Sequence, residues 1–189
     1  MKKILFIVNS DKFFVSHRLP IALAAKKTGY EIHIATKFIT EENNLDGLGF
    51  YLHSLPIERS SLNIKSNFQT VYKIYCLYKS IRPDICHLIT IKPILYGSLC
   101  AYFFRKLSLV ISISGLGYVF SDQGFLSYFK KKFISLIYFF AFNHNSLKVI
   151  FQNKDDREKL LKITKLPKKQ TILIPGSGIN LKNFRPIIN

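Results

Sequence analysis

Short apolar runs alternate with helical patterns along most of this chain, and that alternation limits the fold more than any other feature. An apolar run at Lys3–Val8 is followed by a helical pattern at His17–Lys27 and by a second run at Glu31–Thr36. Nearly continuous apolar strands are typical of parallel sheets that are covered by helices on both faces. The first 36 residues therefore predict a βαβ unit with a right-handed crossover, and the chain as a whole predicts the α/β class.

The pattern continues less regularly to the end of the chain. Ser16 is expected to cap the first helix, in whose first turn Pro20 is tolerated. Five further strands and four further helices are predicted, the strands at 50–55, 84–89, 109–113, 148–152 and 171–175, the helices at 67–81, 93–104, 125–142 and directly after Asn153. A length of 189 residues suits one domain. We assign residues 1–175 to this domain and expect residues 176–189 to lead away from it.

The charge of the chain is strongly positive. Its 28 Lys and Arg residues exceed its 11 Asp and Glu residues, which gives +17 at neutral pH. This balance indicates an anionic partner, such as nucleic acid, phospholipid headgroups or a phosphorylated substrate, and does not choose among them.

Ligands of open parallel sheets bind where the strands end at their carboxyl edge, so the loops there are the candidate sites. The first loop, Asn9–Arg18, lacks GxGxxG, and the chain has no GxxxxGK[ST] motif, which argues against dinucleotides and P-loop nucleotides. It offers Ser16, His17 and Arg18, which suit a sugar or an anion. The alternative is that His17 and Arg18 only solvate a helix end.

Two later loops add candidates. Lys92 lies beside a helix that Pro93 begins, where a cation and free N–H groups together suit a phosphate. The fifth predicted strand runs into Ser114, Gly115 and Gly117, where the backbone can approach a ligand closely, although an ordinary glycine turn explains these residues equally well.

Several chemistries have no support. The chain has no DxD, HExxH, EF-hand or GxSxG pattern, so neither a metal site nor a hydrolytic triad is expected. Its three cysteines form no CxxC pair and fit a reduced compartment. Its N-terminal apolar run is too short for a signal peptide, and its longest uncharged runs are too short to cross a bilayer. We expect a cytoplasmic protein.

A basic cluster precedes the most apolar predicted helix. Lys130, Lys131 and Lys132 are followed by ten residues, 133–142, of which only Ser135 is strongly polar. The lysines would contact anionic headgroups if one face of this helix contacts lipid. Alternatively, the helix belongs to the core.

Taken together, five segments resemble the N-terminal half of bacterial glycosyltransferase family 4 enzymes, and most of all the branch that extends undecaprenyl-pyrophosphate-linked sugars. The resemblance spans essentially the whole chain and is carried by residues 14–20, 87–98, 112–120, 149–153 and 174–186. It implies a Rossmann-like parallel sheet with helices on both faces, which forms one half of a GT-B fold.

The resemblance also implies a function. This half would bind the acceptor, a lipid-pyrophosphate-linked saccharide, through Ser16, His17, Arg18, Lys92, Ser114, Gly115 and Gly117. A C-terminal domain absent from this chain would bind the sugar nucleotide and supply the catalytic residues, so this chain alone would be inactive. Transfer would retain the anomeric configuration without a metal or other cofactor, at the inner face of the bacterial plasma membrane.

One position departs from the family pattern. Many members have a histidine just before the glycine that follows the fifth strand, and this chain has Ser114 there. The lipid-carrier branch shares the serine, which argues against a catalytic histidine at this position. Two alternatives without catalysis stay open: a basic membrane-interface module and a nucleic-acid-binding module. The resemblance itself implies no nucleic-acid partner.

Overall fold

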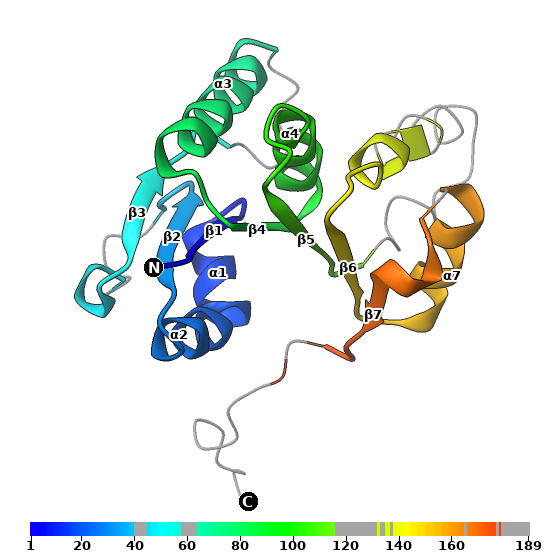
Figure 1. The fold of residues 1–189 in the computed structure, drawn as a ribbon, viewed down its shortest axis with the longest axis horizontal. Coiled ribbons are helices and arrows are strands. Elements are labelled where there is room, and N and C mark those ends of the chain that lie inside the picture. The colour runs from blue at the N-terminus through cyan, green and yellow to red at the C-terminus, as the bar shows by residue number, and fades with distance from the viewer. Residues whose placement is uncertain are drawn as a thin grey trace, which may run out of the picture.

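The computed structural model describes residues 1–39, 45–57, 64–115, 132, 135–136, 138–164, 166–176 and 178. Seven strands form one sheet, in the order β3-β2-β1-β4-β5-β6-β7, and every neighbouring pair is parallel (Figure 1). Their bounds are β1 Lys3–Ile7, β2 Glu31–Thr36, β3 Tyr51–Ser54, β4 Ile85–Ile89, β5 Ser108–Ile113, β6 Leu147–Phe151 and β7 Thr171–Leu173. The predicted fold class, a Rossmann-like α/β sheet, is confirmed.

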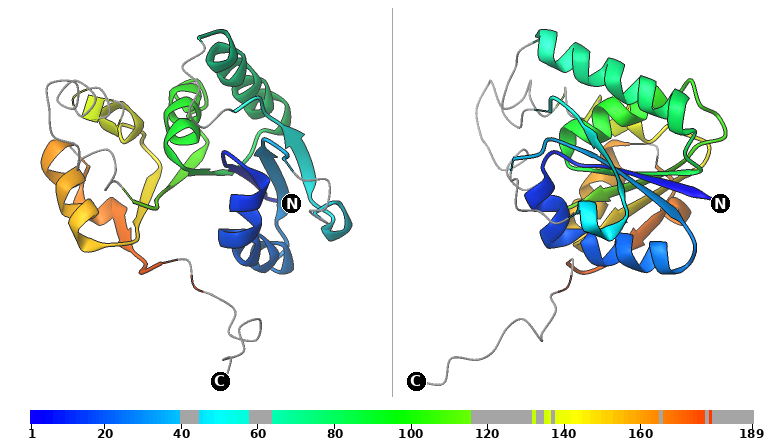
Figure 2. Two further views of the ribbon diagram at one scale, coloured as in Figure 1. Left: turned by 180° about the vertical axis from the view of Figure 1, so that it is seen from behind. Right: turned by 90° about the vertical axis from the view of Figure 1, so that its left-hand side faces the viewer.

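The described helices cover the sheet on both faces (Figures 1 and 2). Their bounds are α1 Asp11–His17, α2 Leu19–Lys27, α3 Ile64–Ile81, α4 Ile91–Ala101 and α7 Lys154–Ile163, with short 3₁₀ turns at η1 Asp46–Leu48 and η2 Lys168–Gln170. Residues 132, 135–136 and 138–141 are helical as well. The other residues of the helix expected at 125–142 lie outside the described part.

Two hydrophobic clusters fill the space between helices and sheet. One lies under α1 and α2 and is built around Phe6, Phe14 and Ile34, all fully buried. The larger one lies under α3 and α4 and includes Tyr78 and Leu88. Strand residues alternate between the two clusters because successive side chains point to opposite faces of a strand.

The first crossover differs from its prediction. Residues 9–18 are not a loop, because Ser10 caps a short helix, α1, by accepting a hydrogen bond from the Phe13 N–H at 3.3 Å. Ser16 therefore lies in the last turn of α1 and does not cap α2, whose N-cap is Arg18 without a side-chain hydrogen bond. Serine is a common N-cap residue, but the seven residues of α1 are too few to show a helical period in the sequence.

The remaining boundaries shift by a few residues. Helix α3 begins at Ile64 and not at 67, and α4 spans Ile91–Ala101 and not 93–104. Lys92 consequently lies inside the first turn of α4. None of the helices in the described residues is both long enough and apolar enough to cross a membrane.

Candidate functional site

The carboxyl edge of the sheet has a point where the chain connections diverge. The crossover from β1 leads through α1 and α2 to β2 on one side, and the crossover from β4 leads through α4 to β5 on the other, while β1 and β4 are neighbours. Such a switch point is where open α/β sheets bind ligands. The residues after β1, β4 and β5 are therefore the ones to examine.

Thr90, directly after β4, has a strained backbone. Its φ of 72° and ψ of 158° fall in a region that is almost restricted to glycine, and threonine is β-branched. The backbone N–H of Ile94 donates to the Thr90 carbonyl at 3.0 Å, which fixes this residue at the start of α4. Strain of this kind persists where the surrounding structure holds it, and it concentrates at functional sites.

Three buried polar oxygens belong to residues at the same edge of the sheet. The Oγ1 atom of Thr90, Oδ1 of Asn9 and Oγ1 of Thr36 are buried and have no hydrogen-bond partner in the described part of the chain. They stand at the ends of β4, β1 and β2, which are neighbours in the sheet. Because a buried oxygen without a partner is costly, these atoms indicate where a polar ligand or water donates hydrogen bonds. None of the three was predicted as a site residue from sequence, since only the order of the strands places them at one edge.

Lys92 lies between the amino ends of two helices. It is half-buried in the first turn of α4, and its Nζ donates to Oδ1 of Asn67 in the first turns of α3 at 3.2 Å. The dipoles of both helices are positive at this edge, as is the lysine itself, so the local field favours an anion.

The three candidate residues of the first crossover, Ser16, His17 and Arg18, lie in two different environments. Ser16 is exposed, and its hydroxyl lies 2.8 Å from the Lys12 carbonyl and 2.6 Å from Nδ1 of His17. The His17 ring stacks on Phe13 with centroids 4.2 Å apart. Arg18, in contrast, is 4% exposed, and its Nη1 donates to the His17 carbonyl at 3.0 Å. Arg18 therefore does not solvate a helix end.

Arg18 acts electrostatically on a buried histidine. Burial first, and the positive charge of Arg18 second, lower the pKa of His87 to about 3. Nε2 of His87 lies 2.7 Å from the hydroxyl of Ser112, and the His87 ring contacts Phe6. Burial also lowers the pKa of Arg18. His87 is thus a neutral core histidine at physiological pH, and its hydrogen bond fixes the end of β5.

The loop after β5 begins with two exposed residues, Ser114 and Gly115. Gly115 has a φ of 154°, which side chains rarely adopt, and a Cβ atom there would meet nothing within 4 Å. Gly117, Lys130 and Lys131 lie outside the described residues, and Lys132 is exposed. Of the predicted site residues, Lys92, Ser114 and Gly115 follow neighbouring strands at the carboxyl edge.

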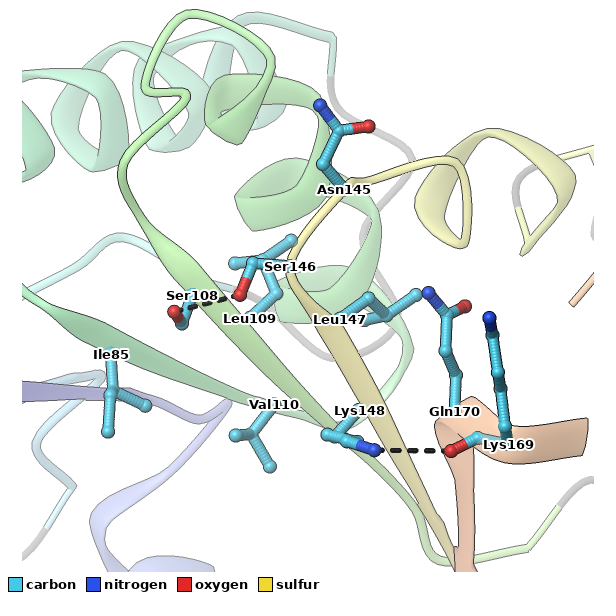
Figure 3. A pocket seen from close by; sticks show the side chains of 10 residues that line it. All are labelled: Ile85, Ser108, Leu109, Val110, Asn145, Ser146, Leu147, Lys148, Lys169 and Gln170. Carbon is cyan, nitrogen blue, oxygen red and sulfur yellow. Dashed lines mark hydrogen bonds between the residues drawn. The ribbon is translucent and has the colours of Figure 1, made fainter. Parts of the chain in front are cut away.

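A hollow of about 550 Å³ lies at the opposite, amino edge of the sheet (Figure 3). It is lined by the first residues of β4, β5 and β6, and by the segment before β7, where Lys148 Nζ donates to the Lys169 carbonyl at 3.1 Å. Because ligands of such folds bind at the carboxyl edge, we do not include this hollow in the candidate site. The described residues contain no cluster of three or more metal-ligating side chains.

Comparison with known proteins assigns the chain to a family. A family model described as glycosyl transferase 4-like matches residues 3–153. The chain belongs to the glycosyl transferase 4-like family. The resemblance stated from sequence is therefore confirmed. The matched residues run from β1 to the end of β6 and include the whole candidate site.

A curated protein whose name states an activity is similar over most of this chain. It is the N,N'-diacetylbacillosaminyl-diphospho-undecaprenol alpha-1,3-N-acetylgalactosaminyltransferase of Campylobacter jejuni, which is 24% identical over 182 residues. The match covers 96% of this chain and 48% of that protein. The chain thus spans about half the length of this relative.

Solved structures share the fold at low identity. Sucrose-phosphate synthase from Thermosynechococcus elongatus matches with a TM-score of 0.68 and 15% identity, over 99% of this chain and 51% of that one. A glycosyltransferase from Rickettsia africae matches at 0.61 and 17%, over 92% and 42%. The UDP-GlcNAc 2-epimerase of Methanocaldococcus jannaschii matches at 0.62 and 15%, over 92% and 45%. In each case this family member corresponds to about half of a GT-B type chain.

Proposed function

We propose that this chain is the acceptor-binding part of a glycosyltransferase that moves a sugar from a sugar nucleotide to a lipid-diphosphate-linked saccharide in surface polysaccharide or glycan assembly. The transferred group would be a hexose or an N-acetylhexosamine. The family membership and the relative that acts on an undecaprenol-diphosphate-linked sugar support this proposal.

One observation carries the proposal. Asn9, Thr36 and Thr90, whose buried oxygens have no hydrogen-bond partner among the described residues, follow neighbouring strands at the carboxyl edge, and Lys92 begins the helix that follows Thr90. A lipid-linked saccharide has matching groups, namely sugar hydroxyls that donate hydrogen bonds and a diphosphate that carries negative charge. In this proposal the oxygens orient the acceptor sugar and Lys92 binds the diphosphate.

The other predicted residues extend this site. Ser16, which is exposed, and His17, which is half-buried, form a polar pair on α1. Ser114, Gly115 and Gly117 would follow the acceptor along the loop after β5. Arg18 would act indirectly, because it is buried and its positive charge lowers the pKa of His87. In our proposal the catalytic residues and the sugar-nucleotide site belong to a C-terminal domain that residues 176–189 lead into. Transfer would retain the anomeric configuration and need no metal or other cofactor.

Binding of a soluble acceptor analogue to this chain tests the proposal. We expect a saccharide on a short prenyl diphosphate to bind the chain, and Lys92→Ala to weaken binding about ten- to a hundredfold, because a charge-assisted contact of about 1.5–3 kcal/mol is lost. Isothermal titration calorimetry would measure both. Lys27→Ala, on the exposed end of α2, is the matched control and should bind like the parent chain.

Two results would reject this function. One is equal affinity of the Lys92→Ala and Lys27→Ala variants for the analogue. The other is transfer by this chain alone when it is mixed with a sugar nucleotide and the analogue, since the proposal places donor binding elsewhere.

We further propose that the protein works at the inner face of the bacterial plasma membrane as a peripheral protein, with Lys130, Lys131 and Lys132 on anionic headgroups. The lipid-linked substrate of the relative supports this location. The net charge of +17 also keeps a second candidate, a basic nucleic-acid-binding module, open to test. That candidate requires salt-dependent DNA binding tighter than binding to anionic vesicles.

A further inference from the structure

Three neighbouring elements each expose a pair of apolar side chains four residues apart. The pairs are Phe68 and Tyr72 on α3, Leu99 and Phe103 at the end of α4, and Leu136 and Phe140 in the helical residues 132–141. The exposed fractions of the side chains are 73% for Phe68 and 61% for Tyr72, 52% for Leu99 and 74% for Phe103, and 52% for Leu136 and 53% for Phe140. We call these six residues the aromatic surface. Side chains four apart share one face of a helix, so Phe68 and Tyr72 point in one direction, whereas Phe103 lies in the turn that follows α4.

The three elements lie in a row on one face of the sheet, opposite α1 and α2 (Figures 1 and 2). Helices α3 and α4 pack against each other, and Tyr75 of α3 contacts the Phe103 ring edge-on at 5.9 Å. The hydroxyl of Tyr102 donates to the Phe140 carbonyl at 3.3 Å, which joins the third element to α4. The three elements that carry the aromatic surface are therefore in contact with one another.

The outward direction of these side chains follows from the buried ones. On α3, Thr70, Ile74 and Tyr78 recur every four residues and are buried against the sheet. Phe68 and Tyr72 fall on the other side of the same helix. Packing within the described fold thus gives no reason for large apolar residues at these positions, and exposed apolar patches of this kind mark interaction sites.

Exposed cations accompany the aromatic surface along the chain and indicate the chemistry of its partner. They are Lys65 and Lys73 on α3, Arg105 and Lys106 in the segment after α4, and Lys132. Neither α3, nor α4, nor the described residues between 132 and 154 contain an acidic residue before Lys154. In an anionic lipid bilayer, acyl chains lie beneath negatively charged headgroups. Exposed apolar side chains can insert among the acyl chains while nearby cations contact the headgroups, so this combination of residues fits such a surface.

We propose that the aromatic surface, with its flanking cations, lies on the anionic surface of a lipid bilayer. The inference deepens the proposed function and rests on it for its biological setting. Phe68 adjoins Asn67, the partner of Lys92, so the proposed bilayer contact borders the candidate acceptor site. A lipid-linked substrate would then reach that site without leaving the membrane.

Vesicle flotation with the whole chain tests this proposal without any saccharide acceptor. We expect binding to vesicles of phosphatidylglycerol and phosphatidylethanolamine, and much weaker binding to phosphatidylcholine. The double variant Phe68→Ser, Phe103→Ser should lower the partition coefficient about tenfold or more, because two exposed aromatic anchors are removed. The matched control is Ile21→Ser, Ile163→Ser, on exposed positions of α2 and α7, which should change binding less than about twofold.

A charge reversal gives an independent second measurement. Lys73→Glu should weaken binding to anionic vesicles strongly, while Lys27→Glu, on α2, should have a smaller effect. Circular dichroism and melting temperatures would confirm that all variants fold, as expected for exposed positions.

Three outcomes would overturn the proposal. The first is equal vesicle binding by the aromatic and control double variants. The second is a dimer in light scattering that the Phe68 and Phe103 substitutions dissociate, since a second copy would then be the occupant. The third is displacement of the vesicles by duplex DNA that binds through the same residues. Vesicle binding without acceptor-analogue binding would reject the proposed function and leave this surface supported.

Discussion

Thr90 combines a strained backbone with an unpartnered side chain, and the two properties can be separated by substitution. The strain belongs to a φ of 72° on a β-branched residue, whereas the polar function belongs to its Oγ1 atom. A second residue with positive φ, Arg82 at 51°, is exposed and follows α3 at the amino edge, away from the candidate site. Arg82 therefore serves as a reference for strain without the site.

We predict that Thr90→Gly leaves the free energy of unfolding unchanged or raises it by up to about 2 kcal/mol, because glycine relieves backbone strain of about 1–3 kcal/mol while the added conformational entropy of the unfolded chain costs about 0.5–1 kcal/mol. The same variant should bind the acceptor analogue about five- to tenfold more weakly, because a hydroxyl contact of about 1 kcal/mol is lost. Urea denaturation and calorimetry measure the two effects. Arg82→Gly should show only the stability effect, and unchanged affinity in Thr90→Gly would remove this residue from the site.

The buried His87 makes stability depend on pH. Its pKa in the folded chain, about 3, is far below the ordinary value, so between about pH 6.5 and 3 the unfolded chain binds a proton that the folded chain does not. Stability should therefore fall as pH falls through this window, with a slope of up to about 1.4 kcal/mol per pH unit from this group.

His87→Gln is the variant that isolates this effect. Its amide can still bond to the Ser112 hydroxyl but does not titrate, so its stability should decline less steeply below pH 6.5 than that of the parent chain. Urea denaturation at a series of pH values measures the difference. Parallel pH profiles for the two proteins would show that His87 is not the group responsible.

Helix α4 positions Thr90 and Lys92, and it lies unusually close to the sheet. Gly97 makes this approach possible: a Cβ atom at this position would overlap the side chain of Leu88 on β4 and lie 3.0 Å from the Tyr78 hydroxyl. The same hydroxyl donates to the Gly97 carbonyl at 3.2 Å, which ties α4 to α3. The geometry of the candidate site thus depends on a glycine one to two turns away from it.

We predict that Gly97→Ala lowers the free energy of unfolding by about 1–2 kcal/mol, since overpacking of about 1–3 kcal/mol outweighs the gain of about 1 kcal/mol in helix propensity. Gly47→Ala is the control, because a Cβ atom there meets nothing within 4 Å. It should change stability by less than about 0.5 kcal/mol. Equal urea midpoints for the two variants would mean that Leu88 on β4 can move to accommodate the added methyl group without loss of stability.

The molecule as a whole is a single parallel sheet whose connections diverge between β1 and β4, and this arrangement follows from patterns that can be read locally. Every strand was predicted to within a few residues, because continuous apolar runs of this length have few other structural solutions. The bilayer contact that we propose, in contrast, rests on exposed side chains such as Phe68 and Leu136, which look like core residues in a linear pattern.

The apolar periodicity of the chain was sufficient to predict the α/β class and the parallel sheet, and the resemblance of five segments indicated the family, because all of these depend on the order of residues along the chain. The environment of individual side chains was not predictable in this way. Arg18 was expected at a surface and is buried, and Asn9, Thr36 and Thr90 were not recognised as one group. Burial and proximity arise when β1, β2 and β4 align side by side, so they depend on contacts between residues that are distant in sequence.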